Sequence, residues 1–322
     1  MDDPEISPEQ QSDQQLKDKV LPPVEPSVRE DRTAGRLPPW GVGSPKERLI
    51  SFGMVLLYAV IFYLLTRIVG FVVLLAARRL QGPVRNALGE VLLALCAIGA
   101  TFILAKLERR SFSSYGFGDS LAGTRFLRGV FWGFASLTLF LLGLRITHHY
   151  YFGSSGIHGA EIFRFGVLYL VLFLGVAFFE ESLTRGYALF KLSDAVGFWP
   201  AVILLSVLFG SGHITNKGES TFGVVAAGLF GVVIAYSILR NGSLWWAIGF
   251  HFMWDYSESF IYGVPDSGFI APGHLLNPSF AGAAWITGGA VGPEGSYFIL
   301  LVLAGLAFVI HVTLPKRRTL KA

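Results

Sequence analysis

The chain has 322 residues, of which 52% are hydrophobic and only 15% are charged. This composition is too apolar for a soluble globular domain, so it excludes that class of protein. The net charge of +4 does not indicate a nucleic-acid partner, because the basic residues flank apolar segments and form no basic stripe with interleaved aromatic residues. We therefore expect a polytopic membrane protein that binds no nucleic acid.

The first 48 residues differ from the rest of the chain, since Pro, Gln and acidic residues predominate there and no apolar period is present. They predict a disordered polar N-terminal tail over residues 1–48 and contain no signal peptide. About 20 apolar residues cross a bilayer as a helix. By that measure the remaining sequence predicts an all-α transmembrane bundle of about eight spans: Leu49–Ala77, Leu88–Leu107, Phe126–Thr147, Phe163–Leu192, Trp199–His213, Phe222–Leu239, Ser243–Tyr262 and Tyr297–Leu314.

These spans also predict an organisation and a topology. Transmembrane helices over residues 49–162 precede a core over 163–262, and residues 263–322 supply a loop, the last span and a basic C-terminal tail. An even number of spans puts both termini on one side of the membrane. Basic residues near both termini predict that the termini lie in the cytoplasm. If the protein is bacterial, the membrane is expected to be the cell membrane. A few basic residues count against the scheme, because they fall on the other side: Arg78, Arg79 and Arg85.

Two adjacent carboxylates, Glu180 and Glu181, lie deep inside the fourth apolar segment. An acidic side chain in hydrocarbon is costly, about 2.5–3.5 kcal/mol for Asp at a helix centre, so such residues are usually functional. Arg185 follows Glu181 by four residues and can pair with it on one helical face. Glu180 points about 100° away from Glu181 and keeps no partner. This makes Glu180 the candidate general base.

The fifth span ends in Phe209 and His213, which lie one helical turn apart on the same face. Glu180 precedes the turn near residues 193–197 by about as many residues as His213 follows it. An antiparallel hairpin would therefore place both side chains at a similar depth. The bland alternative is a histidine that only lies at the membrane interface.

The seventh span carries a polar stripe on an apolar helix. His251, Trp254, Asp255 and Glu258 are spaced i, i+3, i+4 and i+7, which predicts that they share one face toward the bundle interior. Asp255 can orient His251 or stabilise its charge, and His251 can donate a hydrogen bond to an oxyanion. The alternative is a polar pair that only bridges helices.

Taken together, these residues resemble the CPBP family, the Abi or CAAX prenyl-endopeptidase-like intramembrane proteases. The residues that match its three motifs, in chain order, are Glu180, Glu181 and Arg185, then Phe209 and His213, then His251 and Asp255. The resemblance covers about residues 163–262 and implies a CPBP/Abi-like catalytic core there. It implies that the first glutamate activates water with the span-five histidine, and that the third motif forms an oxyanion hole. Glu181, Arg185 and Phe209 then support the site.

The resemblance leaves the cofactor and the substrate open. Family members have been called metalloproteases, and the ligands of a zinc ion would be Glu180, His213 and His251. A metal-free mechanism, in which Glu180 and His213 share the role of base, fits the same residues and is the one we favour. The implied partners are membrane lipid and a protein or peptide substrate, either membrane-anchored, prenylated or neither. Asp255 stands where some relatives have Asn, so either hydrogen bonding or charge is its expected role.

Other functions are compatible with intramembrane acids. A catalytically silent scaffold could keep the same fold, and a proton- or cation-coupled transporter could use the carboxylates directly. A transporter predicts inverted repeats, and the two halves of the chain show no convincing repeat. A Gly-x-Ser-Gly sequence at residues 153–156 is similar to the rhomboid serine motif, but it falls in a polar loop. The intact motifs favour the protease.

Overall fold

The computed structural model describes residues 43–76, 80 and 82–314. The predicted disordered tail over 1–48 therefore lies almost wholly outside the described residues. Its last residues are helical, because α2 begins at Pro45 and not at the predicted Leu49. The Ser44 hydroxyl accepts a hydrogen bond from the Glu47 backbone N–H, and the Glu47 carboxylate accepts one from the Ser44 N–H. This reciprocal capping explains the early start of the helix.

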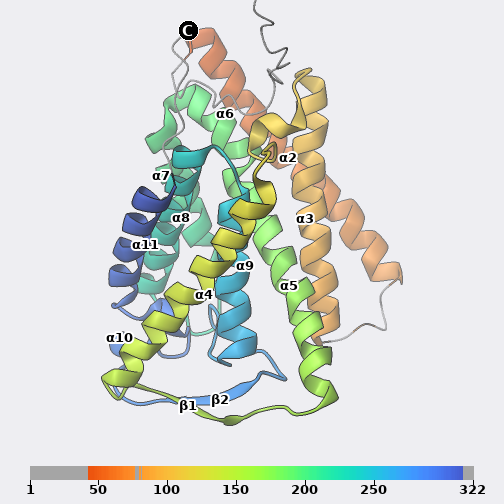
Figure 1. Cartoon of the computed structure of the whole chain (residues 1–322). Helices are drawn as coiled ribbons and strands as arrows, with labels where there is room; N and C mark the ends of the chain where they lie inside the picture. Colours follow the sequence, from red (N-terminus) through yellow and green to blue (C-terminus); the bar gives the residue numbers. More distant parts are fainter. Residues whose placement is uncertain (1–42, 77–79, 81, 315–322) are drawn as a thin grey trace, which may run out of the picture. The chain divides into compact units, whose positions relative to one another are not determined.

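The described residues form an all-α bundle (Figure 1). The long helices are α2 (Pro45–Ala76), α3 (Gly82–Leu107), α4 (Ala122–Ile146), α5 (Ala160–Arg185) and α8 (Thr221–Asn241). The shorter helices are α6 (Tyr187–Val196), α7 (Phe198–Gly212), α9 (Trp245–Tyr256), α10 (Ala284–Thr287) and α11 (Ile299–Thr313). Three short helical turns complete the set: η1 (Phe112–Tyr115), a π-helical turn η2 (Ser257–Ile261) and η3 (Pro293–Gly295).

Each of the eight predicted spans corresponds to helix in the structure. In the described part of the chain, five helical segments are long and apolar enough to cross a membrane, and α7 and α11 are apolar but shorter. Large apolar side chains point outward from the bundle; for example, Leu49, Leu208 and Leu301 are 73%, 66% and 69% exposed. Such apolar surface is stable in contact with lipid. The protein is an integral membrane protein.

The fourth predicted span, Phe163–Leu192, is not one continuous helix. It divides at Gly186, where the backbone leaves the helical region with φ −80° and ψ −128°, and α6 begins at Tyr187. A Cβ at residue 186 would lie only 2.5 Å from the carbonyl oxygen of Ser182 and would clash with it, so this position requires glycine. The break places Arg185 at the last position of α5.

Helix α9 packs against α4 and α5 in the interior of the bundle (Figure 1). Small residues let the backbones of α4 and α9 approach closely. A Cβ at Gly133 of α4 would lie 2.4 Å from the carbonyl oxygen of Phe250, and one at Gly249 of α9 would lie 2.2 Å from that of Phe126. Contacts of this kind are common where membrane helices associate. They hold α9 beside the end of α5 that carries the paired glutamates.

A two-stranded antiparallel ribbon adds to the helices at one end of the bundle (Figure 1). Strand β1 (Tyr150–Ser155) pairs with β2 (Leu276–Phe280), with Tyr150 opposite Phe280 and an irregularity between Tyr151 and Ser154. The Gly-x-Ser-Gly sequence at 153–156 thus lies in and just after a strand. It does not begin a helix inside the membrane, as a rhomboid serine would.

Candidate active site

A cavity of about 330 Å³ lies among α3, α5, α7, α8, α9 and the loop that follows α9. The predicted site residues that line it are Glu180, Phe209, His213, His251 and Asp255. They come from three helices that are distant in the sequence, so the fold brings the three predicted motifs to one cavity. Apolar side chains such as Leu172 and Phe230 form much of the remaining wall. The site is a largely apolar chamber with a few converging polar groups, as is usual for ligand sites.

The two glutamates of α5 occupy different environments. The Glu180 side chain is 25% exposed, toward the cavity, whereas that of Glu181 is fully buried. The predicted pair forms: Arg185 Nη1 donates to Glu181 Oε1 at 2.7 Å, and the Arg185 side chain is only 3% exposed. Glu181 is therefore paired behind the cavity, and Glu180 is the carboxylate that reaches it.

His251 connects the third motif to both glutamates. Its Nδ1 lies 2.8 Å from Glu181 Oε1, within hydrogen-bonding distance of an acceptor-only carboxylate, so Nδ1 carries the proton. Its Nε2 lies 3.6 Å from Glu180 Oε2 and 3.5 Å from Asp255 Oδ2. Sequence analysis links His251 to Asp255 alone. The hydrogen bond to Glu181 joins α5 and α9 across 70 residues of sequence, and no local pattern indicates it.

His213 follows α7 directly as its C-cap residue. Its Nδ1 lies 2.9 Å from the carbonyl oxygen of Phe209, to which it can donate, and the two rings lie 4.9 Å apart. That bond leaves Nε2 as the free ring nitrogen. The Arg185 guanidinium stacks 4.6 Å from the centre of the Phe209 ring, so Phe209 contacts both His213 and the buried ion pair.

Glu180 and His213 line the same cavity, as the predicted hairpin requires, but the structure joins them by no hydrogen bond or ion pair among the described residues. A zinc ion held by the expected ligands, Glu180, His213 and His251, requires their donor atoms to lie close together. Among the described residues, these three do not form a group with ligand atoms within 4.8 Å of one another. Their donor atoms are therefore not gathered around one point in this arrangement.

Other polar residues that sequence analysis did not single out also reach the cavity. Asn86 and Glu90 project from α3, and Asp266 and Glu294 come from the loop after α9. Loss of hydration raises the pKa of Asp266 well above its usual range, and the nearby Glu294 carboxylate raises it further. Glu90 could have been predicted as a site residue, because it is an isolated acidic residue inside an apolar span. The loop acids have no such signal, because acidic loop residues are common on protein surfaces.

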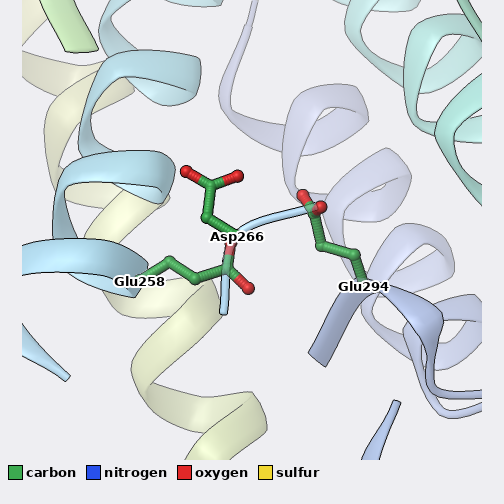
Figure 2. A group of neighbouring side chains, drawn as sticks. All are labelled: Glu258, Asp266 and Glu294. Carbon is green, nitrogen blue, oxygen red and sulfur yellow. The ribbon is translucent and has the colours of Figure 1, made fainter. Parts of the chain in front are cut away.

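The four residues of the predicted polar stripe are all buried in the bundle, as predicted, but they do not all line the cavity. His251 and Asp255 line the cavity, but Trp254 and Glu258 do not. The π-helical turn η2 begins at Ser257 and adds a residue to the turn, so α-helical spacing no longer describes the position of Glu258. Glu258 instead lies beside Asp266 and Glu294 (Figure 2).

The family described as type II CAAX prenyl endopeptidase, Rce1-like, matches residues 162–257. This segment contains every residue of the three predicted motifs, so the predicted resemblance is confirmed over this part of the chain. No curated protein and no solved structure matches the chain.

Proposed function

We propose that this membrane protein, whose residues 162–257 belong to the Rce1-like CAAX prenyl endopeptidase family, hydrolyses a peptide bond in or next to the bilayer. One observation carries the proposal: the three motifs converge on a single cavity, and of the two adjacent glutamates it is Glu180 that reaches it. We propose that residues 163–262 form the catalytic core and that the other helices surround it.

In the proposed reaction, Glu180 acts as the general base. It takes a proton from a water molecule as the water oxygen attacks the carbonyl carbon of the scissile bond. His213, which lines the same cavity, shares this role through Nε2. The proton then passes to the amide nitrogen as the carbon–nitrogen bond breaks, which gives a carboxylate and an amine. The proposed reaction uses protein side chains and water only, and zinc held by Glu180, His213 and His251 is the alternative that a chelator tests.

His251 and Asp255 are proposed to stabilise the tetrahedral intermediate. With Nδ1–H of His251 donated to Glu181, Nε2 is the ring nitrogen that faces the cavity side of the site. As an imidazolium, His251 can donate from Nε2 to an oxyanion, and Asp255, whose Oδ2 lies 3.5 Å from Nε2, orients the ring. Glu181 and Arg185 hold the imidazole in place, and Phe209 supports Arg185 and His213.

The proposed substrate is a protein or peptide segment that reaches the cavity from the membrane, with a prenylated C-terminus as the form that the family name suggests.

The proposed topology puts both termini in the cytoplasm. Reporter fusions after Leu314 and within Gly263–Ser296 test this arrangement. The proposed topology is wrong if the fusion within Gly263–Ser296 reports the cytoplasm, or if the fusion after Leu314 does not.

The experiment that tests the function is cleavage of a quenched peptide library with and without a prenylated C-terminal cysteine. Purified wild type and Glu180→Gln are compared, each with and without a chelator. Turnover by wild type alone supports the proposal, and the prenyl arm then decides the substrate class. If neither protein cleaves any peptide or a membrane-anchored protein library, the chain is a scaffold or a transporter and the proposal is wrong.

A further inference from the structure

Three carboxylates gather next to the cavity without belonging to the catalytic set. Glu258 lies in the π-helical turn η2, Asp266 in the loop after it and Glu294 in the short helical turn η3. One ligand oxygen from each lies within 4.8 Å of the other two. Figure 2 shows the three side chains approaching one another from separate segments. Like charges at this distance repel, so the group needs compensation.

Glu258 points independently to a ligand at this place. The residue is fully buried, and among the described residues neither of its carboxylate oxygens has a hydrogen-bond partner. A buried acidic group normally has its lone pairs satisfied by donors, an ion or water. The Glu258 side chain points toward Asp266 and Glu294, so the place to satisfy it lies among the three carboxylates (Figure 2).

The protein side chains around the group do not neutralise it. Neutral donors contact two of its members: Ser259 and Ser267 hydroxyls donate to Asp266 and Glu294 at 3.2 and 2.6 Å, and the Trp254 indole donates to Glu294 at 3.2 Å. Within the described residues, no Lys or Arg forms an ion pair with any of the three carboxylates. The donors orient the carboxyl groups and bring no positive charge to them.

We propose that Glu258, Asp266 and Glu294 bind a hard divalent cation of the size of Ca²⁺. The donor set contains only oxygen, which suits Ca²⁺ or Mg²⁺ and not zinc, which takes nitrogen and sulfur ligands. Ca²⁺ takes about six to eight oxygen ligands, often several carboxylates of one protein. Mg²⁺ usually keeps several waters and takes only one or two carboxylates, so a group of three carboxylates favours Ca²⁺.

The cation would become part of the wall of the catalytic cavity. Asp266 and Glu294 line that cavity together with His251 and Asp255. A bound cation would therefore remove negative charge next to the proposed oxyanion site. It would also tie the end of α9, through Glu258, to two parts of the following loop. The site is distinct from the expected zinc ligands, and its existence does not depend on the proposed protease function.

The test is calorimetric titration of Ca²⁺, Mg²⁺ or Zn²⁺ into the purified full-length protein in detergent, after chelator treatment and desalting. We expect one Ca²⁺ per chain and a rise in Tm when Ca²⁺ is added. Asp266→Asn, Glu294→Gln and Glu258→Gln should each weaken Ca²⁺ binding by about 10-fold or more, since even indirect supports of a metal site are worth that much. Glu161 is an exposed carboxylate on α5, so Glu161→Gln should leave the affinity for Ca²⁺ unchanged.

Glu180→Gln separates the two proposals, because it should stop peptide cleavage and leave Ca²⁺ binding intact. If Glu258→Gln does not fold, the two loop variants decide the question. Folded wild type that binds no Ca²⁺ at millimolar concentration overturns the proposal and leaves a cluster of protonated carboxyl groups. Binding that survives all three substitutions, or tighter binding of Mg²⁺ or Zn²⁺ at this site, overturns it as well.

Discussion

His251 and Glu181 are joined by a hydrogen bond of 2.8 Å between Nδ1 and Oε1, and the same carboxylate oxygen accepts from Arg185 at 2.7 Å. One buried glutamate therefore connects the first and third motifs across α5 and α9. It fixes which ring nitrogen of His251 remains free for the cavity. In the proposed mechanism Glu181 is a positioning residue, while its neighbour Glu180 reaches the cavity.

Glu180→Gln should abolish peptide cleavage and leave the protein folded. The amide keeps the size of the side chain but cannot accept a proton from water, and loss of a general base lowers rates by about 10²–10⁴-fold. The measurement is initial rate and Tm of the purified variant, with Glu161→Gln as the matched control. Activity of Glu180→Gln within a few-fold of wild type would remove Glu180 from the mechanism.

Arg185→Ala should lower stability more than a surface substitution does. It leaves the buried Glu181 without its arginine partner, and breaking one half of a buried pair costs about 3–5 kcal/mol. Thermal unfolding of Arg185→Ala measures this loss. Arg145→Ala, at the end of α4, is a control from a less buried position. A Tm of Arg185→Ala equal to that of wild type would contradict the supporting role of the pair.

Gly231→Val should also disturb the Glu181–Arg185 pair, although residue 231 is distant from both residues in the sequence. A Cβ at Gly231 of α8 would lie 2.8 Å from Arg185 Nη2 and 3.0 Å from Ser206 Oγ. Overpacking of this kind costs about 1–3 kcal/mol. The matched control is Gly143→Val in α4, where a Cβ would meet nothing within 4 Å. Equal Tm values for the two variants would show that α8 adjusts without strain.

Asp255→Asn and Asp255→Ala separate the two roles expected for this residue. The amide can still hydrogen-bond to His251, whose Nε2 lies 3.5 Å from the carboxylate, whereas alanine cannot. We expect Asp255→Asn to keep activity within about 10-fold and Asp255→Ala to lose about 10²-fold or more, as for removal of a group that stabilises an oxyanion. Equal losses in kcat for both variants would assign the role to charge.

The local pairs of the site could be predicted from the sequence. Glu181 with Arg185, Phe209 with His213, and His251 with Asp255 are each four residues apart, so helical periodicity alone places the partners on one face. The apolar lengths likewise predicted the helical bundle. Such features depend only on the geometry of a single helix.

The rest of the site depends on contacts between segments, which periodicity does not describe. The bond from His251 to Glu181 depends on how α9 packs on α5, and the position of Glu258 depends on a π-helical turn. The division of the fourth span depends on one close contact at Gly186. Asp266 and Glu294 come together only through the path of the loop after α9.

The β1–β2 ribbon has a consequence for the entropy of that loop. Strand β2 (Leu276–Phe280) falls between Asp266 and Glu294 in the sequence, and its pairing with β1 divides the long connection into two shorter arcs. Shorter closed segments have fewer conformations to lose, although the dependence on length is weak. Each arc carries one carboxylate, so the ribbon preorganises both for a shared ligand.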